Sequence, residues 1–217
     1  MCLLIRLAIF DYDGTIADSR ETIVACAAEA LAPHGLAIDA EALLARVGLP
    51  LEAIFAELLP EQDATTQTEL VAAYRARFGE VSARLTRLYP GMRQLLDRLR
   101  EAGIRLAVAT GKSTRGAEDA LARDGLAHLF DAVVGSDAVP RPKPHPDMVE
   151  RLLGKLGFEA GHSCVVGDTT YDMRMASAAG VRPWGVTWGC HGEDALREAG
   201  ALAIARELAD LHQLFFR

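Results

Sequence analysis

The chain has 217 residues, half of them apolar, which suffices for one large core or for a core with a small accessory domain. Its formal net charge is -7 and it carries no basic stripe, so we expect no nucleic-acid partner. The scattered cysteines, with no CxxC pair, indicate buried thiols in a reducing cytoplasm and argue against a disulfide framework or a zinc site; they are Cys2, Cys26, Cys164 and Cys190.

The chain begins with an apolar stretch, MCLLIRLAIF, that Arg6 interrupts. It is far shorter than the ~20 apolar residues that span a bilayer. It also leads straight into two acids, with no small-residue cleavage site of the kind that ends a signal peptide. We therefore predict a buried strand at the start of a soluble, cytoplasmic protein with no membrane partner.

Residues 17–84 show only helical patterns. Apolar residues recur at helical spacing in three stretches, 19–35, 51–59 and 69–85. The segment has five arginines and no lysine against eleven Asp or Glu, so it is acidic. We predict a helical bundle inserted after the first strand. Its helical pattern breaks at Gly48 and Pro50, where we expect a loop.

Beyond the insertion, short apolar runs alternate with helical patterns. The runs are rich in β-branched residues and do not alternate with polar ones, which favours strands that are buried on both faces, as in a parallel sheet. They lie at 104–110, 132–135, 164–168 and 184–188. Helices are predicted at 91–103, 113–125 and 172–180. Strand and helix in alternation indicate an α/β fold with an open parallel sheet.

Polar residues follow the predicted strands. Because parallel strands deliver their carboxyl ends to one edge of the sheet, these residues should meet there. They are Asp11, Asp13, Thr15, Thr110, Lys143, Asp168 and Asp172, and Gly111 directly follows Thr110.

Such a set suits phosphoryl transfer. The acids are tolerable together if a divalent cation lies among them, and Mg²⁺ prefers oxygen ligands. Lys143, Thr15, Thr110 and loop N–H groups can hold a phosphoryl group. Asp11 can attack phosphorus, and Asp13 can protonate the leaving alkoxide and then activate water.

Four motifs in this order, DYDGT, LAVAT, RPKPHPD and GDTTYD, resemble those of the haloacid dehalogenase-like hydrolase superfamily. The segments YPGM, GLPLE and GVTWG resemble its phosphoglycolate phosphatase-like branch. The resemblance implies an open parallel-sheet, Rossmann-like core (1–16 and 85–217) with an inserted helical cap domain (17–84). It also implies a Mg²⁺-dependent phosphatase.

The resemblance also implies roles for single residues. Asp11 and Asp168 would bind the metal through their side chains, and Asp13 through its backbone carbonyl. Asp172 would hold the lysine or a metal-bound water. Gly111 stands where many members carry asparagine, so its contact with phosphate would come from the backbone. In the cap segment ARVGLPLE, Arg46 would meet a substrate carboxylate or a second phosphate, unless it is simply a solvated arginine.

The expected substrate is a small phosphorylated metabolite, with 2-phosphoglycolate the first guess. Sugar-phosphate mutase and pyrophosphatase activities stay open, and a non-catalytic regulatory binder is a remote alternative. Asp13 argues against a dehalogenase, and the lack of a lysine in the cap argues against a phosphonatase. The sequence leaves open a monomer or a homodimer, and the roles of His145, Trp188 and His191.

Overall fold

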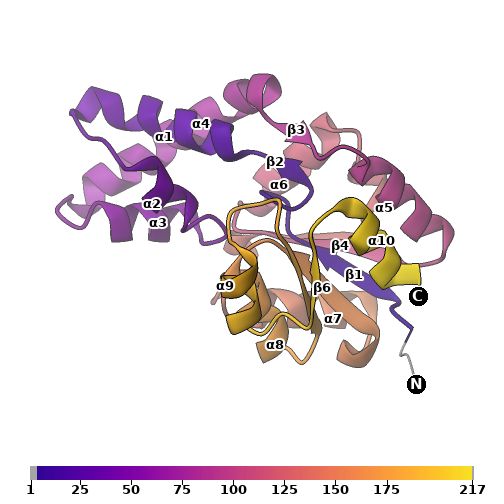
Figure 1. Cartoon of the computed structure of the whole chain (residues 1–217). Helices are drawn as coiled ribbons and strands as arrows, with labels where there is room; N and C mark the ends of the chain where they lie inside the picture. Colours follow the sequence, from indigo (N-terminus) through magenta and orange to yellow (C-terminus); the bar gives the residue numbers. More distant parts are fainter. Residues whose placement is uncertain (1–3, 217) are drawn as a thin grey trace.

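The computed structural model describes residues 4–216, so Cys2 lies outside the described part. A sheet with helices on both faces forms the larger part of the molecule, and a group of helices from the N-terminal third stands to one side of it (Figure 1). Within the described residues, no helix combines the length and the apolar character needed to cross a membrane.

Six parallel strands form the sheet, in the order β5-β4-β1-β6-β7-β8. They are β1 (Leu7–Phe10), β4 (Arg105–Ala109), β5 (Ala132–Val134), β6 (Ser163–Gly167), β7 (Arg182–Val186) and β8 (Ala203–Ala205). The predicted α/β fold with an open parallel sheet is confirmed. Two details differ: β8 was not predicted, and β7 lies two residues upstream of the predicted 184–188.

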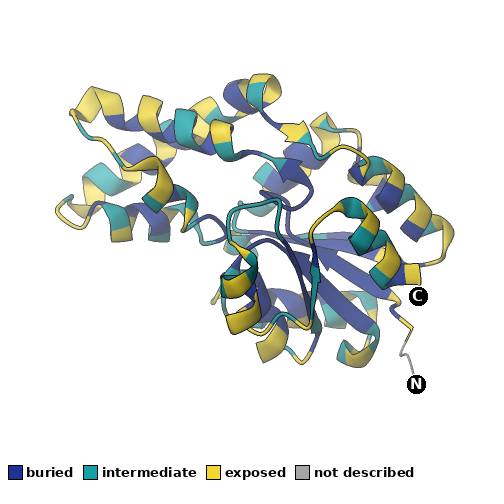
Figure 2. Cartoon of the chain, viewed as in Figure 1, coloured by how far each residue is buried: buried dark blue, intermediate teal, exposed yellow. Residues whose placement is uncertain are grey.

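Both faces of the sheet are covered, so its central strands are dark blue in Figure 2, whereas the edge strand β8 is only partly buried. Successive residues of β1 pack on opposite faces. The helices of this part are α5 (Met92–Glu101), α6 (Thr114–Arg123), α7 (Asp147–Leu156), α8 (Thr170–Ala178), α9 (Glu193–Glu198) and α10 (Leu208–Phe216). Ala8 and Phe10 join the core beneath α5 and α10, whereas Leu7 and Ile9 join the core beneath α7 and α8.

Four further helices pack around a hydrophobic core of their own, which includes Phe55, Leu70 and Tyr74. They are α1 (Arg20–Leu31), α2 (Ala40–Leu44), α3 (Leu51–Leu58) and α4 (Ala64–Leu85). We call this unit the cap, and residues 45–50 between α2 and α3 the cap loop. Short 3-10 helices complete the chain: η1 (Ala32–His34), η2 (Ala127–Leu129), η3 (Ser136–Ala138) and η4 (Ala160–His162).

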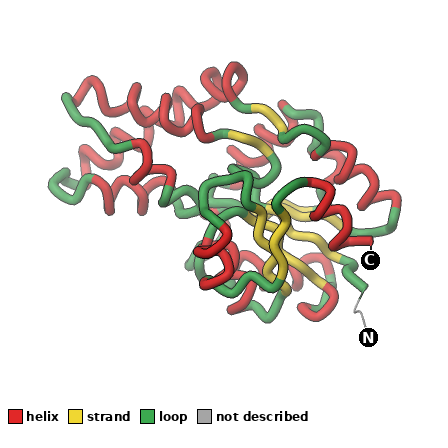
Figure 3. Tube along the Cα trace, viewed as in Figure 1, coloured by secondary structure: helices red, strands yellow, loops and turns green. Residues whose placement is uncertain are grey.

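Two short strands connect the cap to the sheet (Figure 3). They are β2 (Ala17–Asp18) and β3 (Arg87–Leu88), and they pair antiparallel with each other. The chain therefore leaves the sheet for the cap and returns to it at one place.

The centre of the sheet is where the connections change direction. Phe10, the last residue of β1, pairs with Val108 of β4 on one side and with Val166 of β6 on the other. In sheets of this kind ligands bind outside the carboxyl ends of the strands, at such a switch point. The residues that follow β1, β4 and β6 are therefore brought to one site beneath the cap.

Candidate active site

Asp11 directly follows β1, and its two carboxylate oxygens differ. Oδ1 accepts the backbone N–H of Tyr12 at 2.7 Å and lies 3.0 Å from Nζ of Lys143. Oδ2 is buried and has no hydrogen-bond partner among the described residues. The side chain is thus fixed through one oxygen while the other is left available for a ligand or for attack.

Lys143 reaches Asp11 from the proline-rich loop that precedes α7. Its Nζ also lies 2.6 Å from Oδ1 of Asp172, and all three side chains are buried. Burial alone would lower the pKa of Lys143, but Asp11 and Asp172 raise it above its usual value. The lysine is therefore a permanent buried cation, and it offsets part of the negative charge around it.

Asp172 is held in place by the start of α8. Its Oδ2 accepts both the backbone N–H and the hydroxyl of Thr169, at 3.1 and 2.6 Å. The two residues form a capping box that opens the helix. With Oδ1 on Lys143, both oxygens of Asp172 are engaged.

Asp168 follows β6 and is fully buried. Its Oδ1 accepts the hydroxyl of Thr15 at 2.8 Å, and its Oδ2 accepts the backbone N–H of Cys190 at 2.7 Å. The backbone comes so close that a Cβ atom on Gly14 or Gly189 would lie 2.2 Å from Oδ2 of Asp168. Gly14 also has a φ of +75°, so glycine is needed there for two reasons.

These acids fit a divalent cation. Oxygens of Asp11, Asp168 and Asp172 lie within 4.8 Å of one another. Burial raises the pKa of Asp11 and of Asp168 above the usual carboxyl range; neighbouring acids add to the effect, and Lys143 opposes it. A cation would stabilise both ionised carboxylates. Asp172 is the poorest ligand of the three, because its Oδ1 is paired with the cation of Lys143 and its Oδ2 accepts two hydrogen bonds. Oδ2 of Asp11 has no partner, and each oxygen of Asp168 accepts one hydrogen bond from a neutral donor.

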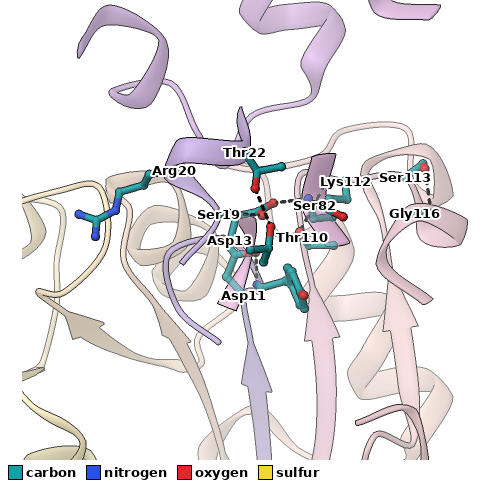
Figure 4. Close-up of polar contacts among 12 residues, drawn as sticks. Asp11, Asp13, Ser19, Arg20, Thr22, Ser82, Thr110, Lys112, Ser113 and Gly116 are labelled. Carbon is teal, nitrogen blue, oxygen red and sulfur yellow. Dashed lines mark hydrogen bonds and ion pairs between the residues drawn. The ribbon is translucent and has the colours of Figure 1, made fainter. Parts of the chain in front are cut away.

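Asp13 lies above Asp11 on the cap side of the site (Figure 4). Its Oδ1 accepts the hydroxyl of Ser19 at 2.5 Å, and its Oδ2 lies 2.9 Å from Nζ of Lys112. The same ammonium group lies 3.9 Å from the ring centre of Phe78 on α4, a cation–π contact with the cap. Lys112 was not singled out for the site from the sequence, although it directly follows Thr110 and Gly111 at the same sheet edge.

Thr110 and Gly111 line a cavity of about 620 Å³ together with Asp11 and Asp13. The cap loop closes tightly over Gly111: an added Cβ atom would lie 2.6 and 2.7 Å from the carbonyl oxygens of Gly48 and Leu49. An asparagine at 111 would therefore collide with the cap loop in this arrangement. Any contact between residue 111 and a substrate has to come from its backbone.

Two residues predicted to bind substrate are placed elsewhere. The hydroxyl of Thr15 donates to Asp168, so it supports the metal site. Arg46 does not line the cavity: its Nε lies 2.9 Å from Glu57, and its Nη1 donates to the carbonyl of Ala42 at 2.9 Å. The expectation that Arg46 meets a substrate carboxylate is therefore corrected, because α3 supplies its partner.

His191 links the cap to the sheet. Its Nδ1 accepts the backbone N–H of Thr170 at 3.0 Å, so its Nε2 carries the proton and donates to the carbonyl of Ala45, also at 3.0 Å. Trp188 donates its Nε1–H to the carbonyl of Thr15 at 3.2 Å. Both side chains position the loops around the site, whereas His145 is exposed.

A family model described as haloacid dehalogenase-like hydrolase matches residues 8–186 of the chain. The match runs from the second residue of β1 to the end of β7, so it contains the cap and the site residues from Asp11 to Asp172, whereas Trp188 to His191 lie beyond it. The chain belongs to the haloacid dehalogenase-like hydrolase family. The family predicted from the four motifs is thereby confirmed.

Individual relatives agree with this assignment. The chain is 40% identical over 210 residues to a probable phosphatase, IndB, from Dickeya dadantii, covering 94% of this chain and 91% of the relative. It is 34% identical to a phosphoglycolate phosphatase from Haemophilus influenzae, covering 85% and 86%. A crystal structure of a predicted phosphatase from Clostridium acetobutylicum superposes with a TM-score of 0.88 at 30% identity, covering 98% and 99%. These relatives place the chain among the family's phosphoric monoester hydrolases.

Proposed function

We propose that this haloacid dehalogenase-like hydrolase is a Mg²⁺-dependent phosphatase that cleaves small phosphate monoesters through an aspartyl-phosphate intermediate. The observation that carries the proposal is the asymmetry of Asp11. Its Oδ1 is held by Tyr12 and Lys143, while Oδ2 is buried without a partner at the carboxyl end of β1. A desolvated carboxylate oxygen fixed in this way is suited to nucleophilic attack.

In the proposed reaction, Oδ2 of Asp11 attacks the phosphorus atom and the bond from phosphorus to the alcohol oxygen breaks. Asp13 gives its proton to the departing oxygen. It can do so only after the leaving oxygen has replaced the Ser19 hydroxyl at Oδ1 of Asp13. Asp13 then takes a proton from a water molecule, whose oxygen attacks phosphorus and releases Asp11 and inorganic phosphate.

The charges around Asp11 support this assignment. Lys143 would neutralise part of the phosphoryl dianion, and it lowers the pKa of Asp11 against the larger, opposite effect of burial. Thr110 and Gly111 line the cavity at the end of β4, and in the proposed reaction the Thr110 hydroxyl and the Gly111 backbone N–H donate hydrogen bonds to phosphoryl oxygens. Mg²⁺, held by Asp11, Asp168 and the predicted backbone carbonyl of Asp13, would supply charge neutralisation for the phosphoryl oxygens.

The substrate is the finer part of the proposal. The first compound to assay is 2-phosphoglycolate, because it is the substrate named for a relative that is 34% identical. Phosphate transfer between sugar hydroxyls and hydrolysis of inorganic pyrophosphate use the same carboxylate pair and are the alternatives. A cytoplasmic location and a monomeric or homodimeric state remain predictions.

The test is hydrolysis of p-nitrophenyl phosphate by the purified chain, with and without Mg²⁺. We expect turnover with Mg²⁺, none in excess chelator, inhibition by Ca²⁺, and none in Asp11→Asn, which keeps the size of the side chain but removes the nucleophile. Asp119→Asn, at the exposed edge of the same cavity, is the matched control and should stay active. Steady turnover by Asp11→Asn would refute the aspartyl-phosphate mechanism.

A further inference from the structure

The cap side of the cavity is apolar. Eight of the side chains that the cap contributes to its lining are hydrocarbon: Ile23, Leu43, Val47, Leu49, Leu51, Ile54, Phe78 and Ala83. They come from α1, α2, α3, α4 and the cap loop, so the apolar wall surrounds the space opposite Asp11 and Asp13. The leaving group of a bound phosphate ester would have to lie in this space.

Every cation that lines the cavity already has an anionic partner among the described residues. Lys112 pairs with Asp13, Arg75 with Glu52 at 2.7 Å, and Arg123 with Asp124 at 2.9 Å. Arg115 lies 3.9 Å from Asp119 and is 92% exposed, so it faces solvent.

A carboxylate or a second phosphate on the leaving group would therefore lose its hydration without gaining a free cation. Burying an uncompensated charge is costly. Arg46, the one cap cation that the sequence suggested for this purpose, is bound to Glu57 and lies outside the lining. The charged side chains of the site are thus available to the phosphoryl group and not to the leaving group.

The size and shape of the cavity point the same way. Its volume, about 620 Å³, lies in the range of roughly 300–1,000 Å³ that is typical of sites for drug-sized ligands. Two aromatic rings of α4, Tyr74 and Phe78, lie on its wall with their centres 5.7 Å apart. Aromatic side chains offer both faces and edges to another ring.

We propose that the cap forms a subsite for an uncharged leaving group that carries an apolar ring, so that ring-bearing phosphate monoesters are better substrates than 2-phosphoglycolate. The inference rests on the phosphatase function proposed above. It restricts the proposed substrates to phosphate monoesters whose leaving group can bind to the apolar wall of the cap.

The test compares three primary alkyl phosphates, whose leaving alcohols demand similar help from Asp13. Ethyl phosphate is the reference, 2-phenylethyl phosphate adds a ring, and 2-phosphoglycolate adds a carboxylate. Burial of a phenyl group should raise kcat/KM for 2-phenylethyl phosphate over ethyl phosphate by roughly 10- to 100-fold. We expect 2-phosphoglycolate to lie below 2-phenylethyl phosphate.

Variants identify the subsite through the ratio of kcat/KM for 2-phenylethyl phosphate to that for ethyl phosphate. Phe78→Ala and Leu51→Ala should both lower this ratio, because each removes part of the apolar wall. Phe78 also touches Lys112, but any effect on Asp13 acts on both esters and cancels in the ratio. Val71→Ala is the matched control: it truncates a buried residue of α4 that does not line the cavity, and its ratio should equal that of the wild type.

Three results would overturn the inference. One is a kcat/KM for 2-phosphoglycolate that equals or exceeds that for 2-phenylethyl phosphate. Another is a ratio of kcat/KM for 2-phenylethyl phosphate to that for ethyl phosphate that is near one in the wild type, or that is unchanged in Phe78→Ala and Leu51→Ala. The enzyme still hydrolyses phosphate esters in each of these results, so the proposed phosphatase function stands. Absence of Mg²⁺-dependent hydrolysis of all three esters and of p-nitrophenyl phosphate would overturn the function, and the subsite with it.

Discussion

Replacing Thr15 with valine should weaken metal binding and leave substrate binding intact. Valine has nearly the shape of threonine, so the change removes one hydrogen bond, the 2.8 Å contact from the Thr15 hydroxyl to Oδ1 of Asp168. Both residues are fully buried, so water cannot replace the lost donor. A hydrogen bond to a charged group contributes about 1.5–3 kcal/mol. Since about 1.4 kcal/mol corresponds to a factor of ten, the loss is equivalent to roughly 10- to 150-fold.

An independent expectation has the same size, because losing a hydrogen-bonding partner of a metal ligand typically costs about 10- to 100-fold in metal affinity. The assay is a Mg²⁺ titration of turnover. The concentration that gives half-maximal activity should rise by about that factor in Thr15→Val and return towards wild type in Thr15→Ser, which keeps the hydroxyl. KM for the ester at saturating Mg²⁺ should be unchanged. A higher KM together with an unaltered Mg²⁺ requirement would show that Thr15 holds the phosphoryl group, as the sequence predicted.

Asp13→Ala should lower kcat by roughly 10²- to 10⁴-fold for alkyl phosphates and by less for p-nitrophenyl phosphate, whose leaving group needs no proton; equal losses on the two would contradict its role as the acid. In excess chelator, the free energy of unfolding should fall as pH rises from 5 to 8. Burial raises the pKa of Asp11 and of Asp168, so in this pH range the folded chain holds protons that the unfolded chain has released. Denaturant midpoints measure this slope, which Asp168→Asn should flatten; a rising stability would contradict it. Arg46→Ala should leave KM unchanged for both 2-phosphoglycolate and p-nitrophenyl phosphate, since its side chain is paired with Glu57 in a partly exposed ion pair and does not line the cavity; a higher KM for 2-phosphoglycolate alone would restore Arg46 as a substrate ligand.

The sequence predicted the parts of the fold that a repeating pattern encodes. Runs of buried residues identified β1, β4 and β6, and the convergence of parallel strands then placed Asp11, Thr110 and Asp168 side by side. β8 was not predicted because it has only three residues, two of them partly buried, and so short a strand shows no apolar pattern in the sequence. The predicted bounds of β7 were two residues too far towards the C-terminus, because Trp188 resembles a buried strand residue in the sequence. In the structure Trp188 lies in a loop, where its indole N–H donates a hydrogen bond to Thr15.

The hydrogen-bond partners of polar side chains could not be predicted from the spacing of residues along the sequence. Thr15 stands where a phosphate donor is expected, but Asp168, remote in the sequence, is the acceptor within reach. Arg46 is eleven residues from Glu57, and only the packing of α2 against α3 brings them together. Lys112 was overlooked for the same reason: its ion pair with Asp13 joins the loops after β4 and β1, and its contact with Phe78 exists only once the cap lies over the sheet.

The pairing of β2 with β3 makes the cap a modular insertion. Ala17 faces Leu88 and Asp18 faces Arg87, so the points where the chain departs and returns are adjacent in space. None of the six strands of the sheet depends on the cap for a hydrogen-bonded neighbour. In topological terms the cap is an oversized hairpin loop, and its length and sequence can vary without disturbing the strand order. A cap grafted onto this same strand pair from another phosphatase would therefore bring a new choice of alcohol to an unaltered phosphoryl-transfer centre.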